Sequence, residues 1–225
     1  MRIGMEFIKP PLGFLRSIID KNSESKDIAL DVYCSGKYLF RKFFWMRLWM
    51  LTLAIRRHSK TRGICLDFGG GSGIFTPSLA SGFDHVHLID LNTEQANQVK
   101  SRLGLENISI VTANVYEYDY GEGKFDAIVA ADVLEHFEDL KGPIEKIYRW
   151  ISKTGYLYTS LPTENIYYKF LRKVFNKQKP ADHYHSAADV EDFLNSKGFK
   201  KVSGYYHPLF IPIFPLFRIS VWQKV

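Results

Sequence analysis

A glycine-rich segment at residues 66–75, Leu-Asp-Phe-Gly-Gly-Gly-Ser-Gly-Ile-Phe, limits what this chain can fold into more than any other feature. The apolar run at 64–68 enters it with the length of a buried parallel strand, and a helix-like stretch at 74–81 leaves it. Glycine permits positive φ angles and lets the backbone approach a ligand closely. The N-terminus of the following helix is expected to offer free N–H groups to that ligand. The glycines of this predicted binding turn are Gly69, Gly70, Gly71 and Gly73.

The spacing of these glycines separates two classes of cofactor site. A nicotinamide or flavin site carries G-x-G-x-x-G, in which the third glycine packs the helix against the strand. Here the spacing is G-x-G-x-G, Ile74 takes the place of the third glycine, and Asp67 precedes the turn. The pattern D-x-G-x-G-x-G resembles the first motif of the class I S-adenosylmethionine-dependent methyltransferases. A glycine-rich turn without a ligand is the other interpretation.

From residue 63 onward, strand-like and helix-like segments alternate. This alternation predicts a mostly parallel sheet built from right-handed strand–helix–strand units. The expected strands are 64–68, 85–90, 107–112, 125–130, 155–161, 199–206 and 217–223, and the expected helices between them are 74–81, 93–103, 140–152 and 187–197. The resemblance implies a Rossmann-like α/β sheet of seven strands in the order 3-2-1-4-5-7-6, with an antiparallel last strand and helices on both faces.

The residues before this alternation are expected to form a helical cap. We predict a cap over 1–60, a methyltransferase-like domain over 61–225, and an acceptor-side insertion at about 163–185. The helix expected at 36–58 is apolar most of the way round, which predicts that it is covered on more than one side. By the resemblance, an arginine of this cap pairs with the carboxylate of the cofactor, and Arg47 is the first choice, with Arg41 second. A solvated surface arginine is the alternative.

Four further residues match cofactor-binding positions of the family. Asp90 ends the second strand, where a carboxylate can accept both hydroxyls of a ribose, with Leu91 beside it. Asn114 follows the third strand, where the family usually has an aspartate that binds the adenine amino group; an asparagine oxygen can still accept that bond. The backbone N–H of Val115 would then bind a ring nitrogen. A plain turn residue is the alternative for Asn114.

The fourth strand ends in Phe-Asp-Ala-Ile-Val-Ala-Ala-Asp-Val-Leu-Glu-His, residues 125–136. This stretch is similar to one in the small-molecule branch that includes the ubiquinone-biosynthesis O-methyltransferases. By that resemblance, the methionine arm of the cofactor lies here and small Ala131 leaves room for it. His136 would stand beside the sulfonium as a general base for the acceptor. A purely structural histidine remains open, since positioning can supply much of the rate of methyl transfer.

Two further histidines, His183 and His185, lead into the helix expected at 187–197. One of the two, for which we take His185, is expected near the acceptor. No metal site is expected, because two histidines one residue apart with no evident third ligand rarely hold an ion.

The composition of the chain restricts the cellular compartment in which the protein works and the partners that it can bind. Cys34 and Cys65 give neither a disulfide framework nor metal spacing, so we expect reduced thiols in a cytoplasmic protein. The apolar stretch at 43–55 is too short to span a bilayer, and the one at 206–217 contains three prolines. Residues 63–152 carry a net charge of −8 between ends of +8 and +6. This distribution favours an anionic acceptor or surface near the two ends, although ordinary solvated lysines would give it too.

Together these features predict a methyltransferase that uses S-adenosylmethionine and releases S-adenosylhomocysteine. The expected acceptor is a small molecule, apolar or lipid-linked, with peripheral membrane contact through the apolar stretches. Nucleic acid is not expected, because Ala131-Asp132-Val133-Leu134 stands where base-amino methyltransferases carry a Pro-Pro turn, and neither cysteine follows a proline. A non-catalytic cofactor-binding scaffold docked to a membrane or a biosynthetic complex is the alternative, and a nicotinamide oxidoreductase is a weaker one. The oligomeric state is left open.

Overall fold

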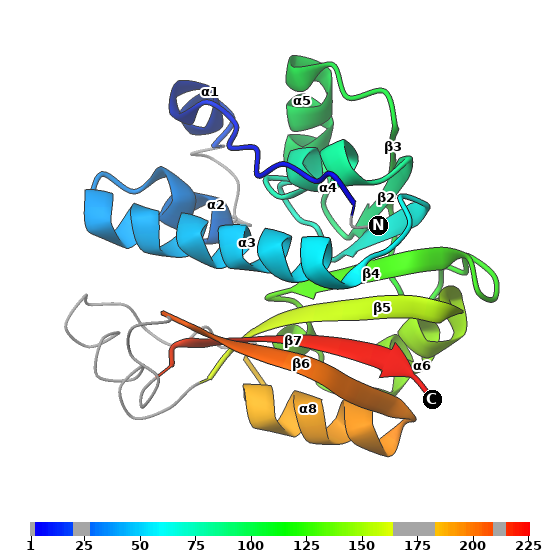
Figure 1. The fold of residues 1–225 in the computed structure, drawn as a ribbon. Coiled ribbons are helices and arrows are strands. Elements are labelled where there is room, and N and C mark those ends of the chain that lie inside the picture. The colour runs from blue at the N-terminus through cyan, green and yellow to red at the C-terminus, as the bar shows by residue number, and fades with distance from the viewer. Residues whose placement is uncertain (1–2, 20–27, 164–182, 209–214) are drawn as a thin grey trace. The chain divides into compact units, whose positions relative to one another are not determined.

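The computed structural model describes residues 3–19, 28–163, 183–208 and 215–225 (Figure 1). Its strands are β1 (Ile64–Phe68), β2 (His85–Asp90), β3 (Ile108–Thr112), β4 (Phe125–Ala131), β5 (Ile151–Pro162), β6 (Phe199–His207) and β7 (Phe217–Lys224). They form a seven-stranded sheet in the order β3-β2-β1-β4-β5-β7-β6. Strand β7 runs antiparallel to both of its neighbours, β5 and β6. The Rossmann-like sheet predicted from the sequence is confirmed.

The chain divides into two compact units, residues 1–118 and 119–225. The first unit contains β1 to β3 and the helices α1 (Leu12–Ser17), α2 (Ile28–Cys34), α3 (Tyr38–His58), α4 (Thr76–Gly82) and α5 (Glu94–Leu103). Its strands are parallel, with Phe68 paired to Ile89 and Asp90 paired to Thr112. The carboxyl ends of these strands therefore lie side by side, and the polar residues that follow them are brought together.

The N-terminal segment packs along α4 in an extended conformation. The Ser78 hydroxyl accepts from the Ile8 N–H (2.9 Å), and the Ser81 hydroxyl accepts from the Glu6 N–H (2.9 Å). Met5 is buried beside Gly82, where a Cβ would come within 2.7 Å of its side chain. The N-terminal segment is thus part of this unit. The short helices α1 and α2 were not predicted, because six or seven residues are too few to show helical periodicity.

Helix α3 confirms the long helix predicted at 36–58 and begins two residues later, at Tyr38. Trp45, Leu48 and Leu51 are buried, but Trp49 is 41% exposed and Leu53 is 38% exposed. The helix is therefore covered on more than one side, as expected, and keeps one exposed face that carries Trp49 and Leu53. The division into a cap over 1–60 and a domain over 61–225 stays a prediction.

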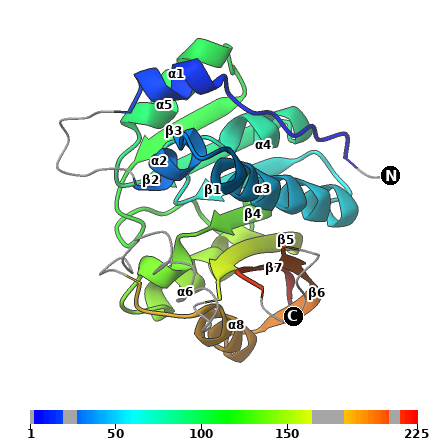
Figure 2. The same ribbon diagram turned by 90° about the vertical axis from the view of Figure 1, so that its left-hand side faces the viewer.

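The second unit contains β4 to β7, the 3₁₀ turn η1 (Leu134–His136), α6 (Lys141–Trp150) and α8 (Ala187–Ser196). Helix α8 lies against β6 (Figure 2). Strand β5 begins at Ile151, four residues before the predicted start, because the chain passes from α6 directly into the sheet. Most of the predicted insertion (164–182) and part of the apolar connection near the end (209–214) lie outside the described residues.

No helix in the described part of the chain is long and apolar enough to cross a membrane.

Candidate functional site

The glycine turn and the end of β2 meet at Asp90. Its carboxylate oxygen Oδ2 accepts the Gly71 N–H (2.9 Å), and its Oδ1 accepts the Asn92 N–H (3.0 Å). The side chain is half-buried, so it is accessible from outside. Each oxygen accepts one backbone N–H and keeps further acceptor capacity. A carboxylate held in this way can accept the two hydroxyls of a ribose.

The glycines of the turn are needed for different physical reasons. Gly69, Gly71 and Gly73 have φ angles of 67°, 49° and 71°, in the left-handed region that disfavours other residues. A Cβ at Gly70 would lie 2.7 Å from the Leu88 side chain and 2.8 Å from Asp67 Cγ. A Cβ at Gly71 would meet nothing closer than 3.9 Å. The surface over Gly71 is therefore open, and a ligand can approach the backbone there.

Asp67 lies beneath this turn. Its side chain is buried, and its Oδ2 accepts a hydrogen bond from the Thr76 hydroxyl (2.8 Å). The pKa of Asp67 is raised from 3.8 to about 7, because burial and, to a lesser extent, the nearby Asp90 carboxylate raise it by more than the Thr76 hydrogen bond lowers it. Asp67 thus joins the strand before the turn to the helix after it.

The expectation of free N–H groups at the following helix needs correction. Helix α4 begins at Thr76, two residues later than predicted, and it has Pro77 in its first turn. The Thr76 N–H binds the Gly73 carbonyl and the Ser78 N–H binds the Phe75 carbonyl, while Pro77 has no N–H. These donors are therefore already used, and the Asp90 carboxylate and the open glycine backbone remain as ligand-binding groups.

The other residues predicted to bind the cofactor in the first unit lie near the same strand ends. Leu91 follows Asp90 and is 72% exposed. Asn114 is exposed, and its Oδ1 accepts the Tyr116 N–H (3.1 Å) in a local turn. Val115 is buried. The β3 end is tied to β2 through the Ala113 N–H, which donates to the Asp90 carbonyl (3.0 Å).

Arg47 lies in the middle of α3 and is buried, with 3% of its surface exposed. Its Nη2 donates to the Tyr33 hydroxyl of α2. Arg41, the second choice, donates from Nη1 to the Ser35 carbonyl (2.5 Å). Both arginines thus make hydrogen bonds within the first unit, and their role toward the cofactor stays a prediction.

In the second unit, the chain turns sharply after β4. Ala131 ends the strand and is half-buried. Asp132 follows with φ of 54°, the only described non-glycine residue with a positive φ, and its N–H donates to the Ser160 carbonyl (2.8 Å). Such a conformation is uncommon for residues other than glycine and tends to occur at functional sites. The turn leads directly into η1, which contains Glu135 and His136.

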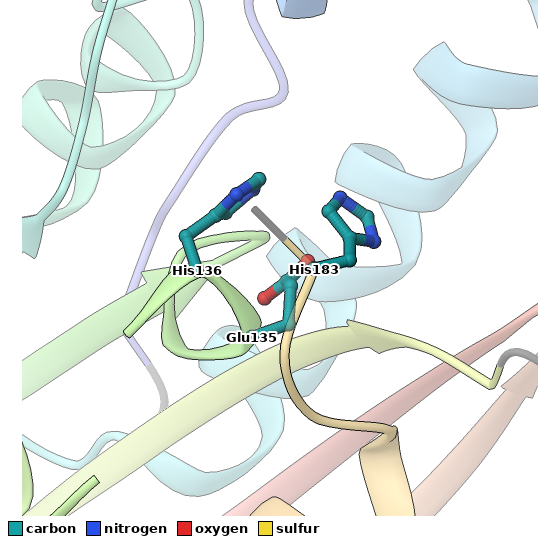
Figure 3. Close-up of side chains that lie close together, drawn as sticks. All are labelled: Glu135, His136 and His183. Carbon is teal, nitrogen blue, oxygen red and sulfur yellow. The ribbon is translucent and has the colours of Figure 1, made fainter. Parts of the chain in front are cut away.

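His136 stands beside His183 rather than beside His185. The rings of His136 and His183 are 4.6 Å apart and perpendicular, and Glu135 lies next to both (Figure 3). The ring of His185 instead lies with Nε2 3.2 Å from the Glu138 carbonyl. In the sequence, Glu135 and His183 lie within recognisable motifs that assign neither of them a role. Nothing in their spacing could have paired them, because 48 positions separate them in the chain.

The comparisons with known proteins decide the family. Residues 39–203 match a family model described as a methyltransferase domain. The chain belongs to this family. The matched region includes the glycine turn, the ends of β2 and β3, and the Glu135–His183 segment of this methyltransferase domain.

The chain is similar to named methyltransferases in sequence and to solved methyltransferase structures in fold. A probable (S)-tetrahydroprotoberberine N-methyltransferase 2 of Papaver bracteatum is 26% identical over 148 residues, which are 64% of this chain and 35% of the relative. The chain thus spans about a third of that relative's length. A methyltransferase structure from Aquifex aeolicus covers 96% of this chain and 100% of its own, with a TM-score of 0.66 and 16% identity.

A second solved structure was determined with a bound product. The N-methyltransferase NodS of Bradyrhizobium japonicum WM9 in complex with S-adenosylhomocysteine covers 82% of this chain and 87% of its own, with a TM-score of 0.61 and 18% identity. At such low identity these structures establish the shared fold.

Proposed function

We propose that this methyltransferase domain transfers a methyl group from S-adenosylmethionine to a small-molecule acceptor and releases S-adenosylhomocysteine. Membership of the methyltransferase-domain family supports this activity. The single observation that carries it is the Asp90 carboxylate, fixed by the Gly71 and Asn92 N–H groups at the mouth of the glycine turn. The alternative of a non-catalytic scaffold is not favoured.

The residues of the first unit fit this cofactor. Asp90 would accept the ribose hydroxyls, and the open backbone at Gly71 would let the sugar approach. The exposed Leu91 side chain offers an apolar surface for the adenine ring. Asn114 and the Val115 N–H would bind the adenine edge, since the Asn114 oxygen keeps a second acceptor site besides its bond to Tyr116.

The remaining predicted residues have different tasks in this proposal. Arg47 would pair with the carboxylate of the cofactor through guanidinium N–H groups, besides its bond to Tyr33. Asp67, together with Gly69, Gly70 and Gly73, would hold the shape of the turn. The bound cofactor supplies a methyl carbon already activated by a positively charged sulfur, so positioning supplies much of the rate.

In the second unit, small Ala131 would leave room at the end of β4, and His136 would take a proton from the acceptor. His185, two residues from His183, would contact the acceptor. The acceptor we propose is an apolar small molecule. The name of the Papaver relative supports this class, because a tetrahydroprotoberberine is a small molecule methylated at nitrogen. Methylation at oxygen, nitrogen or carbon is compatible with this proposal.

Isothermal titration with S-adenosylhomocysteine tests the cofactor site. The wild-type protein is expected to bind in the micromolar range, and Asp90→Ala is expected to lose at least about tenfold in affinity, because charge-assisted bonds to the ribose are removed. Asp84→Ala is the matched control, since Asp84 is an exposed aspartate of the same unit that pairs with Arg62 at the surface (3.1 Å).

NADH is the second control and should give no heat of binding. Equal affinity of wild type and Asp90→Ala for S-adenosylhomocysteine would refute the assignment of Asp90. Binding of NADH in preference to S-adenosylhomocysteine would restore the oxidoreductase interpretation.

We also propose that the protein works in the cytoplasm with peripheral contact to anionic membranes. Both cysteines are free and buried, as expected for a reducing compartment. One face of α3 presents Trp49 and Leu53 together with the exposed Lys42 and Arg56, a combination typical of helices that lie on a membrane surface. Flotation with anionic vesicles tests this contact, and protein that stays at the bottom of the gradient would argue against it.

A further inference from the structure

Three side chains with metal-ligating atoms converge after the end of β4 in the second unit. Glu135 and His136 belong to η1, and His183 belongs to the segment that leads into α8 (Figure 3). One ligand atom from each of the three residues lies within 4.8 Å of the other two. Glu135 is 1% exposed, and both histidines are half-buried. The cluster therefore combines a buried carboxylate with two imidazoles that solvent can reach.

The backbone holds these residues together independently of any ligand. The Tyr184 N–H donates to the Glu135 carbonyl (2.8 Å), which ties the segment containing His183 to η1. Immediately after it, Ser186 and Asp189 form a reciprocal capping box that fixes the start of α8. On the other side, buried Leu134 anchors η1 in the core. Two distant parts of the chain are thus positioned to share one site.

The chemistry of the three side chains is that of a transition-metal site. One carboxylate and two imidazoles are the protein ligands of a common type of catalytic zinc site, and the same set also binds other first-row divalent ions. Ligand atoms at about 2.0–2.1 Å from a tetrahedral ion lie about 3.3 Å from one another. Rotation of half-buried histidine side chains can close the observed 4.8 Å to this spacing.

We propose that Glu135, His136 and His183 bind one divalent transition-metal ion of the zinc class. Three protein ligands leave one position of a tetrahedral ion open, and that position would take an oxygen of the acceptor. No metal was expected from the sequence, because His183 and His185 lie one residue apart with no evident third ligand near them in the chain. The structure brings Glu135 and His136 to His183 instead.

The proposed ion deepens the proposed methyltransferase function, on which its role in the reaction rests. A hydroxyl bound to the ion has a lowered pKa and releases its proton to water. With the ion bound, His136 acts as a ligand, and the ion takes over the activation of the acceptor that His136 would otherwise perform as a general base. Methylation of the resulting oxygen anion forms an O–C bond and breaks the S–C bond, and the sulfur keeps the electron pair of the broken bond. The acceptor class that fits this site is therefore a hydroxyl-bearing small molecule.

Metal binding is measured on untagged, chelator-treated protein by isothermal titration with Zn²⁺ and by visible absorption with Co²⁺. Wild type is expected to bind one ion per chain and to give the intense bands of tetrahedral Co²⁺. Glu135→Gln and His183→Ala are each expected to weaken binding by about 100-fold or more, since each removes one of three ligands. His185→Ala is the matched control, because it removes a histidine of the same segment that lies outside the cluster.

Acetohydroxamate, an oxygen chelator, probes the open position. Its addition to the Co²⁺ form should change the absorption bands, and an unchanged spectrum would overturn the acceptor-oxygen part of the proposal. Unaltered metal binding in Glu135→Gln and His183→Ala would overturn the site, as would an equal loss in His185→Ala or no binding by wild type.

The same titrations separate this proposal from the cofactor site. The Glu135 and His183 variants are expected to keep their affinity for S-adenosylhomocysteine, which shows that they are folded. Asp90→Ala is expected to keep its affinity for Zn²⁺. If the wild-type protein binds S-adenosylhomocysteine but not Zn²⁺, the metal site fails and the cofactor site stands. If it binds Zn²⁺ but not S-adenosylhomocysteine, the cofactor site fails and the metal site stands.

Discussion

At the scale of single residues, two neighbouring glycines of the turn are needed for different physical reasons, although they belong to one sequence motif. Gly70 has no room for a Cβ, because Leu88 and Asp67 occupy the space. Gly71 has room for one but has a positive φ and an open side. A substitution at Gly70 is therefore a packing change, whereas one at Gly71 changes the surface offered to a ligand.

Gly71→Ala is expected to fold and to lose cofactor affinity. The left-handed conformation destabilises alanine by about 1–2 kcal/mol, and the new methyl group occupies the approach to the turn. We expect S-adenosylhomocysteine binding to fall by at least about tenfold, measured by isothermal titration.

Gly104→Ala is the matched control for this change. Gly104 has φ of 62° at the end of α5, and a Cβ added there would meet no atom within 4 Å, so the substitution carries the same backbone penalty away from the turn. The control should lose similar stability and keep its affinity. Equal affinities of the two variants would contradict an open ligand approach at Gly71.

At the scale of elements, a buried carboxylate joins α8 to two strands. Glu191 of α8 accepts from Lys201 of β6 (2.7 Å), Arg218 of β7 (2.7 Å) and Ser220 of β7 (2.5 Å). Burial would raise the pKa of Glu191, but the hydrogen bonds from Lys201 and Ser220 and the two positive charges lower it below its usual value. Helix α8 is thereby fixed on the sheet, and the segment with His183 directly precedes it.

Glu191→Gln is expected to lower the free energy of unfolding by about 2 kcal/mol at pH 7, because it weakens charge-assisted hydrogen bonds. Since the pKa of Glu191 is lowered in the folded state, the stability it contributes is present above the unfolded pKa. That contribution is lost as the pH falls through the folded value. The difference between variant and wild type, measured by urea unfolding, should therefore shrink in acid.

Asp192→Asn serves as the control for Glu191→Gln, because the neighbouring Asp192 is exposed. It should change stability by no more than about 0.5 kcal/mol. A destabilisation by Glu191→Gln that stays constant from neutral to strongly acidic pH would argue against the charge as its cause.

At the scale of the whole molecule, one buried acid makes unfolding depend on pH near neutrality. Asp67 has its pKa raised from 3.8 to about 7, so between these values the folded chain holds a proton that the unfolded chain releases. The stability associated with this proton is present at pH 4 and is lost as the pH rises through 7. The full shift corresponds to about 4 kcal/mol.

Asp67→Asn removes this dependence and keeps an oxygen to accept the Thr76 hydroxyl. The variant is expected to gain stability over wild type by about 3 kcal/mol on going from pH 5 to pH 8, measured by urea unfolding, because most of the shift falls within this range. Asp84→Asn, at an exposed site, should show no such trend. The same stability difference at both pH values would mean that Asp67 is already ionised at pH 5.

The sequence by itself determined the sheet and the location of the glycine turn. The predicted strands 64–68 and 85–90 have the same bounds in the structure, because a short apolar run between turn residues leaves few other positions at which a strand can begin or end. Asp90 could be placed as well, since a residue at the end of a parallel strand lies at the ligand-binding edge of the sheet. These features depend on residues that are near one another in the chain or are related by the regular topology of the fold.

Only the tertiary structure decided which side chains meet outside that regular pattern. It showed that the first N–H groups of α4 are used internally, that Asp67 lies beneath the turn with Thr76, and that one face of α3 is exposed. It also brought His183 to Glu135 and His136 through a backbone hydrogen bond across 49 positions of the chain. No local periodicity encodes such a meeting, because it depends on how an irregular segment packs against a turn.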